Sequence, residues 1–78
     1  TSAAGGINNA YKVCDFMLVK DHVFMPGLAG LSPLVGLSDE FGPKFVSLHD
    51  AYSKDLRDLA LNIANETKIR IHEGIYVM

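Results

Sequence analysis

The sequence predicts an α/β fold built from two strands, a long loop and a helix. Three observations lead to this class: an apolar run over residues 16–24, an amphipathic stretch over 50–68 and a second apolar run over 69–78. The order strand, long loop, helix, strand is typical of α/β proteins, in which a helix crosses over between neighbouring strands. One helix cannot cover both faces of a sheet, so residues 1–78 are expected to form a single partial domain.

The two predicted strands differ in how they are covered. Residues 16–24 combine β-branched, aliphatic and aromatic side chains, which is typical of a strand that is at least half buried. Asp21 and His22 interrupt this run near its end. In residues 69–78 the first half alternates between apolar and polar side chains, and the second half is continuously apolar. This pattern indicates one exposed face followed by a stretch covered on both faces.

The intervening residues 25–49 predict a long loop. Glycine and proline recur through the segment and mark turns. A loop of this length is uncommon in a compact domain and is usually functional or disordered. Its many apolar side chains argue against disorder and need a surface to pack on; they are Leu28, Leu31, Leu34, Val35, Leu37, Phe41 and Phe45.

A helix is predicted over residues 50–68. Asp50 is a suitable N-cap, because its carboxylate can accept a hydrogen bond from a free backbone N–H of the first turn. Leu61 falls off the apolar stripe of this helix, which indicates cover on two sides. The stripe itself follows helical spacing and consists of Tyr52, Leu56, Leu59, Ala60 and Ile63.

Composition argues against several classes of protein. A chain of 78 residues allows one domain at most. Its net charge of −2, without a basic run, gives no reason to expect nucleic acid or an anionic membrane as a partner. No apolar run reaches the roughly 18 residues that a membrane span needs. The sequence starts without Met and without a basic signal-peptide region, so we expect a segment cut from a longer chain.

The reactive side chains give little sign of catalysis by themselves. Cys14 is the single cysteine, which fits a reducing compartment such as the cytoplasm, and the neighbouring Asp15 disfavours a thiolate. Cys14 is therefore expected to be a small structural residue. No spacing around the three histidines resembles a metal site, so no metal is expected. Asp39 and Glu40 are expected to be solvated, and His22 to be a hydrogen-bonded structural residue.

The opening segment is the strongest candidate for ligand binding. Its small residues and paired glycines let backbone approach a ligand closely, and exposed N–H groups bind an anion such as phosphate. A tight glycine turn after a strand explains the same residues without a ligand, so both interpretations stand at this point. Phe45, taken alone, is expected to be a core residue.

Five motifs follow one another along the chain. Residues 1–8 read Thr-Ser-Ala-Ala-Gly-Gly-Ile-Asn, and residues 16–27 form a strand that ends in Asp-His and leads to Pro-Gly. Residues 32–45 carry Ser-Pro-Leu-Val-Gly, the acids Asp-Glu, and Phe-Gly-Pro-Lys-Phe. Asp-Ala-Tyr opens the helix at 50–52, and Glu-Gly-Ile-Tyr-Val-Met fills 73–78. In this order and spacing the motifs resemble those of the trimeric purine nucleoside phosphorylases along nearly the whole chain.

The resemblance implies a fold and a reaction. The chain would be an internal fragment of a nucleoside-phosphorylase-type mixed β-sheet flanked by helices. The reaction would be phosphorolysis of a purine nucleoside to the free base and ribose 1-phosphate, in purine salvage, by a cytoplasmic homotrimer. Inorganic phosphate would be the co-substrate, and no cofactor is implied. Such chemistry needs a held phosphate, a fixed sugar and a stabilised leaving base.

The resemblance also assigns residues. Ala3 matches the alanine whose backbone N–H contacts phosphate, and Ala4 and Gly5 match the wall beside the purine and ribose. Phe45 matches a loop phenylalanine that reaches into the neighbouring subunit's site and covers the sugar, which replaces the expectation of a core residue. Tyr52 matches the first helical turn and is expected to pack.

The remaining machinery is expected outside this segment. By resemblance, the phosphate-binding Ser, Arg and His lie upstream, and the base-reading Glu and Asn and the ribose His lie downstream. No catalytic residue is therefore expected within the chain, and a free 78-residue peptide is expected to be inactive. The alternative is a truncated or decayed copy that serves at most as a subunit-interaction piece. The related methylthioadenosine phosphorylases share the fold, but Asn8 and the Phe-Gly-x-Lys-Phe motif at 41–45 favour the purine enzyme.

Three positions depart from the family pattern. Ser2 replaces the usual Asn, and Leu37 stands where Pro is common. Cys14 stands where the family has a turn glycine, and a Cβ there would strain a residue with positive φ. The loop is also one residue shorter between Glu40 and Phe41.

Overall fold

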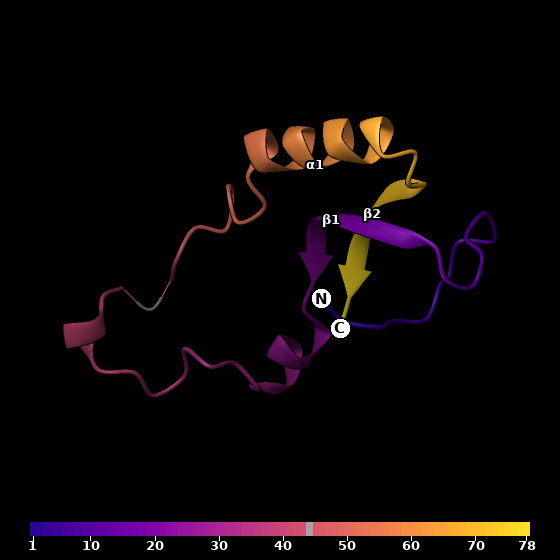
Figure 1. The fold of residues 1–78 in the computed structure, drawn as a ribbon. Helices are drawn as coiled ribbons and strands as arrows, with labels where there is room; N and C mark the ends of the chain where they lie inside the picture. Colours follow the sequence, from indigo (N-terminus) through magenta and orange to yellow (C-terminus); the bar gives the residue numbers. More distant parts are fainter. Residues whose placement is uncertain (44) are drawn as a thin grey trace.

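The computed structural model describes residues 1–43 and 45–78. Lys44, which belongs to the Phe-Gly-Pro-Lys-Phe motif, lies outside the described residues. Figure 1 shows the main elements: strand β1 (Phe16–Val23), helix α1 (Lys54–Glu66) and strand β2 (Ile71–Val77). Two short 3-10 helices, at Met25–Ala29 and Asp39–Phe41, interrupt the long loop. The predicted α/β class and the order strand, long loop, helix, strand are confirmed.

The two strands pair in parallel, so the long loop and α1 together form the crossover between them. Phe16 lies opposite Ile71 at one end of the pair, and Val23 lies opposite Val77 at the other. The register shifts between Val19 and Asp21, which is the mark of a β-bulge in β1. The two predicted strands therefore lie side by side in one sheet.

The N-cap of helix α1 lies three residues later than the sequence predicts. Its N-cap is Ser53, whose Oγ accepts a hydrogen bond from the backbone N–H of Leu56 at 3.5 Å. The prediction of Asp50 as N-cap is therefore wrong. Asp50 and Ser53 are both good N-cap types, so residue type alone does not decide between them. Tyr52, which precedes the helix, has its hydroxyl 3.1 Å from His22 Nδ1 of β1. Tyr52 is thus outside the first helical turn.

The helix ends in a Schellman motif. The N–H of Ile69 donates to the carbonyl of Ala64 at 2.9 Å, and the N–H of Lys68 donates to that of Asn65 at 3.3 Å. Lys68 has φ +57°, the left-handed conformation that this motif requires. The predicted extension of the helix to Lys68 is therefore too long, because the chain reverses after Thr67.

Helix α1 turns a different face to the sheet from the one its apolar stripe suggests. Leu56, Leu59 and Ile63 are exposed among the described residues. The less exposed positions are Arg57, Ala60, Leu61 and Ala64, which share one face at helical spacing. Arg57 donates to Glu73 of β2 at 3.0 Å, which fixes that face toward the sheet. The predicted cover on two sides would need a further layer over the leucine stripe.

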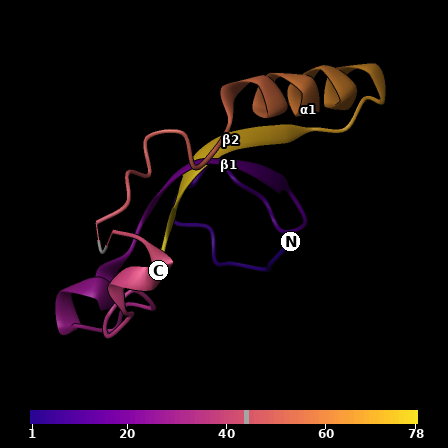
Figure 2. The same cartoon turned by 90° about the vertical axis from the view of Figure 1, so that its left-hand side faces the viewer.

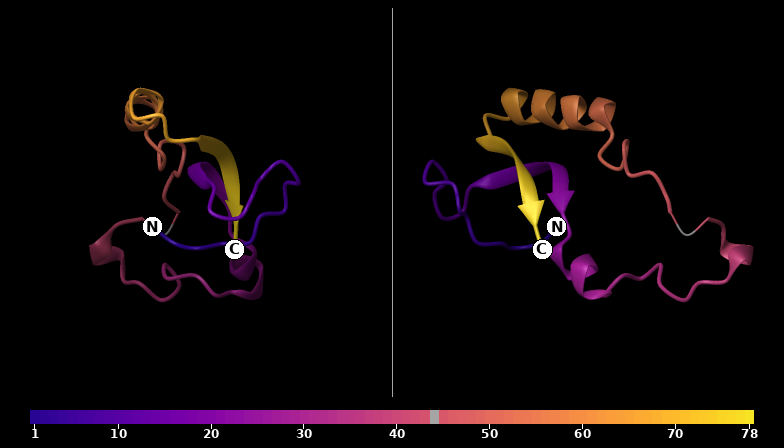
Figure 3. Two further views of the ribbon diagram at one scale, coloured as in Figure 1. Left: turned by 45° about the vertical axis from the view of Figure 1, so that its right-hand side comes forward. Right: turned by 180° about the vertical axis from the view of Figure 1, so that it is seen from behind.

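The described chain is extended. Its radius of gyration is 15.9 Å, whereas a compact domain of this length has about 11.5 Å, and it measures 47 × 26 × 16 Å. The long loop runs away from the sheet and returns to α1, as Figures 2 and 3 show from other sides. Ala64, at 6% exposure, is the buried hydrophobic residue of the described part. The apolar side chains of the loop, Phe41 and Phe45 included, are exposed within this chain.

Candidate functional site

The opening segment is exposed and lies outside any helix or strand. Ala3, Ala4 and Gly5 have open surroundings, and a Cβ added at Gly5 would meet no described atom within 4 Å. Neither Gly5 nor Gly6 has a positive φ, so neither glycine is required by an unusual backbone conformation. Among the described residues, none accepts a hydrogen bond from the N–H of Ala3. This geometry leaves that N–H available to an anion, as the phosphate assignment requires.

Two turns connect the opening segment to β1. The N–H of Tyr11 donates to the carbonyl of Asn8, and the N–H of Asp15 donates to that of Lys12, each at 3.0 Å. Cys14 lies in the second turn with φ +74° and is exposed. The sequence-based expectation of positive φ at Cys14 is confirmed, and this residue carries a Cβ in a conformation that favours glycine.

An interaction that sequence reasoning missed ties these turns to β2. His72 Nε2 lies 2.8 Å from Asp15 Oδ2, and both side chains are partly buried, at 21% and 17% exposure. Since a carboxylate only accepts, His72 donates through Nε2. The ring of Tyr11 lies on that of His72, with centroids 4.6 Å apart. These residues are far apart in sequence, and only the register of β2 brings them together.

The environment of Asp15 stabilises its ionised form. The backbone N–H of Lys12 donates to Asp15 Oδ2 at 2.9 Å, and with His72 it holds the pKa of Asp15 below the ordinary 3.8. The nearby positive charge of Arg70 acts in the same direction. Asp15 is therefore a structural carboxylate that stays ionised at neutral pH, and not a general acid.

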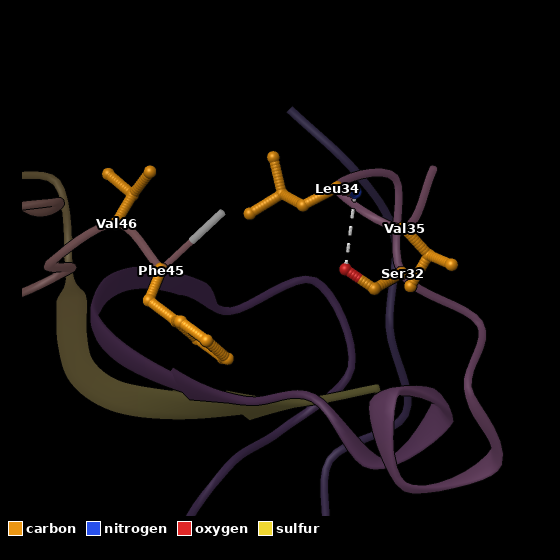
Figure 4. A pocket seen from close by; sticks show the side chains of 5 residues that line it. All are labelled: Ser32, Leu34, Val35, Phe45 and Val46. Carbon is orange, nitrogen blue, oxygen red and sulfur yellow. Dashed lines mark hydrogen bonds between the residues drawn. The ribbon is translucent and has the colours of Figure 1, made fainter. Parts of the chain in front are cut away.

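Phe45 lines a shallow apolar depression of about 310 Å³ formed by two parts of the long loop. Figure 4 shows its ring and the side chains of Leu34, Val35 and Val46 around this space. Ser32 Oγ accepts from the N–H of Leu34 at 3.3 Å and holds the turn on one wall. With 88% of its surface exposed, Phe45 is not a core residue of this chain.

The predicted site has two parts: Ala3, Ala4 and Gly5 in the opening segment, and Phe45 in the long loop. The structure does not bring these two parts together within one chain. The opening segment, residues 1–9, lies beside the sheet, whereas the described parts of the loop at 38–43 and 45–48 lie on the opposite side in both Figure 1 and Figure 2. A second depression, at the start of α1, is lined by Asp50 and Asp55 with Ser53 and Lys54. Its two carboxylates repel phosphate, so it does not replace the opening segment as an anion site.

The other singled-out residues have ordinary structural surroundings. His22 contacts Tyr52 edge to face, with ring centroids 5.7 Å apart, in addition to their hydrogen bond. Glu40 accepts a hydrogen bond from Ser38 Oγ at 2.8 Å and is exposed, as is Asp39. Within residues 1–43 and 45–78 there is no group of three or more His, Cys, Asp or Glu side chains arranged to hold a metal ion.

Comparison with known proteins identifies the family. The sequence matches the Phosphorylase superfamily over residues 1–78. The chain belongs to this superfamily. It is 51% identical to the purine nucleoside phosphorylase of Saccharomyces cerevisiae over 97% of its own length, which is 25% of that enzyme. The chain thus spans about a quarter of the length of the curated relatives it matches.

Solved structures agree in fold as well as in sequence. The Schistosoma mansoni purine nucleoside phosphorylase in complex with adenosine superimposes with a TM-score of 0.90 at 46% identity, covering 97% of this chain and 28% of that one. A purine nucleoside phosphorylase in complex with ribose 1-phosphate gives 0.88 at 46% identity, over 97% and 29%. The predicted resemblance to purine nucleoside phosphorylases and the predicted fold type are confirmed. None of the helices described in this superfamily member has the length and apolarity to cross a membrane.

Proposed function

We propose that this chain is the central part of a purine nucleoside phosphorylase. Phosphate oxygen attacks the anomeric carbon of the nucleoside, the glycosidic bond breaks, and its electron pair leaves with the purine, which then takes a proton. The products are the free base and ribose 1-phosphate. The observation that supports this most strongly is the close superposition, at nearly half identical sequence, on an enzyme solved with adenosine.

In this proposal the opening segment supplies backbone and small side chains. The free N–H of Ala3 donates to phosphate, while Ala4 and Gly5 form a wall beside the purine and the ribose. A wall without long side chains lets the flat base and the sugar approach the backbone closely. An N–H held in place stabilises the anionic phosphate without reorganising during the reaction. Inorganic phosphate is the co-substrate, and the proposal includes no cofactor.

Phe45 acts from a neighbouring subunit in this proposal. The loop that carries it extends away from the sheet, and its ring is exposed on an apolar depression. An aromatic face in this position can cover the sugar of a site in another copy of the chain. We therefore propose a homotrimer in the cytoplasm that serves purine salvage. The segment by itself is proposed to be inactive, since a site shared between subunits needs the whole protein.

The first test is the natural gene product. Its intact mass should be several times the 8.5 kDa of this segment, and the purified product should convert inosine and phosphate to hypoxanthine and ribose 1-phosphate. The synthetic 78-residue peptide should not convert inosine and phosphate to these products. A natural product of 8.5 kDa without phosphorolysis would favour the alternative of a truncated copy.

The role of Phe45 has a test of its own. Phe45→Ala removes the ring over the sugar, and burial of a phenylalanine contributes about 1.5–3 kcal/mol, so the KM for inosine should rise on the order of tenfold or more. Phe41→Ala is the matched control, because Phe41 is a second exposed aromatic of the loop and does not line the depression. An equal rise in KM for both variants would contradict a specific role of Phe45.

A further inference from the structure

Tyr11, Asp15 and His72 form a cluster next to the opening segment. His72 donates to Asp15 at 2.8 Å, and its ring lies under that of Tyr11 at 4.6 Å between centroids. The hydroxyl of Tyr11 makes a long hydrogen bond of 3.5 Å to the carbonyl of Glu73. The two turns at residues 8–15 are thus held against β2 by three contacts with two neighbouring residues of that strand.

The cluster touches the glycines of the opening segment. A Cβ added at Gly6 would lie 3.6 Å from Tyr11 Cβ and 3.7 Å from Tyr11 Cδ2, so the Tyr11 ring lies against the backbone of Gly6. On its other side Tyr11 reaches Gly74 of β2, where an added Cβ would lie 2.9 Å from the hydroxyl. Tyr11 therefore fills the space between Gly6 and β2.

Little else within the described chain holds the opening segment. Among the described residues, no hydrogen bond involves residues 1–7, whereas Asn8 accepts from the N–H groups of Ala10 and Tyr11 at 2.9 and 3.0 Å. Within the described chain, the turn that starts at Asn8 is therefore the nearest hydrogen-bonded anchor of Ala3. That turn is fixed to β2 by the cluster.

We propose that Tyr11, Asp15 and His72 are positioning residues for phosphate binding. They hold the turns at 8–15 on β2 and thereby set the place of the Ala3 N–H. The kinetic readout of this inference rests on the proposed phosphorolysis. The contacts between the turns and β2, from which the inference is drawn, are independent of that proposal. The cluster touches no substrate in this account and acts through the backbone of residues 3–8.

The test uses the natural gene product with His72→Ala. This change removes the hydrogen bond to Asp15 and the ring contact with Tyr11 together. Arg57→Ala is the matched control: it breaks a 3.0 Å ion pair to Glu73 of the same strand, with comparable exposure, and does not touch the opening segment. His72→Gln is the conservative variant, since its amide N–H can still donate to a carboxylate.

Two readouts are taken for each variant. The first is the phosphorolysis of inosine, in which His72→Ala should raise the KM for inorganic phosphate about tenfold and change the KM for inosine less, because a misplaced donor weakens phosphate binding. The second is the motion of Ala3 and Ala4, followed by NMR relaxation of 13C-labelled alanine methyl groups. Both methyl groups should become more mobile in His72→Ala and stay unchanged in Arg57→Ala. His72→Gln should recover part of both effects.

The outcomes separate this inference from the proposed function. If the unaltered protein shows no phosphorolysis but His72→Ala mobilises Ala3 and Ala4, the proposed function fails and the positioning role stands. If these methyl groups keep their mobility in His72→Ala, or Arg57→Ala mobilises them equally, the inference is overturned. Should His72→Ala not fold by circular dichroism, Tyr11→Phe, which removes only the hydrogen bond to Glu73, and His72→Gln give the same comparison.

Discussion

Replacing Cys14 by glycine should stabilise the protein. Cys14 has φ +74° in the turn before β1 and is exposed. A residue with a Cβ loses about 1–2 kcal/mol in the left-handed region. Glycine removes that strain but costs about 0.5–1 kcal/mol through the greater freedom of its unfolded chain. The exposed thiol contributes little buried surface, so the net gain for Cys14→Gly lies between about 0 and 1.5 kcal/mol, with a central value of about 0.7 kcal/mol.

The gain is measured by urea unfolding of the natural gene product, followed by circular dichroism. At a slope of about 2 kcal/mol per molar urea, the midpoint should rise by roughly 0.35 M at this central value, with the slope unchanged. Cys14→Ala is the control, because it keeps the Cβ and removes only Sγ, and its midpoint should stay near that of the unaltered protein. If Cys14→Ala stabilises as much as Cys14→Gly, the thiol and not the backbone conformation is responsible, and the reasoning fails.

Three further predictions concern the end of α1, the packing of β2 and the charge of Asp15. Lys68→Gly, at the left-handed position of the Schellman motif, should raise the free energy of unfolding by about 0.5–1 kcal/mol in the same assay, whereas Lys68→Ala should not. Gly74→Ala should lower it by about 1–3 kcal/mol, since the new Cβ meets the Met17 sulfur, and adding Met17→Ala should recover part of the loss. The pKa of Asp15 is lowered on folding, so its stabilising contribution is complete above its unfolded value of 3.8 and is lost as the pH falls through the folded value. The stability difference between the unaltered protein and Asp15→Asn should therefore persist at about pH 5 and shrink below 3.8; a difference that grows in acid would reverse the assigned sign.

The strands could be predicted because their signal is local. The apolar runs that become β1 and β2 contain the β-branched and aromatic residues that favour strands, and no distant partner is needed to find them. The helix start could not be placed in the same way. Ser53 and Asp50 are equivalent by type, and the hydrogen bond between Tyr52 and His22 joins residues thirty positions apart. The existence of β1 and β2 could thus be read from local sequence, whereas the start of α1 could not be placed from residue type alone.

The candidate site also contains features that the sequence could indicate and features that it could not. The phosphate assignment of Ala3 rests on a backbone N–H, which every residue except proline carries, so residue type alone gives no signal. The small residues and paired glycines of this segment gave a weak ligand-binding signal that a tight turn also explains, and the resemblance of the whole motif was needed to favour phosphate. The cluster of Asp15 with His72 had no signal at all, because the two side chains meet only when β2 pairs with β1 in the observed register.

The exposed apolar residues connect the fold with the proposed assembly. Leu56, Leu59 and Ile63 form one exposed stripe on α1, and Phe45 is exposed on the long loop. Full burial of each such side chain contributes about 1.5–3 kcal/mol, so the described contacts alone leave much of the available hydrophobic stabilisation unused. The stripe lies on the helix and the Phe45 ring on the loop, so they belong to two different elements. In the proposed assembly, another part of the protein would cover α1 and a second subunit would cover the loop.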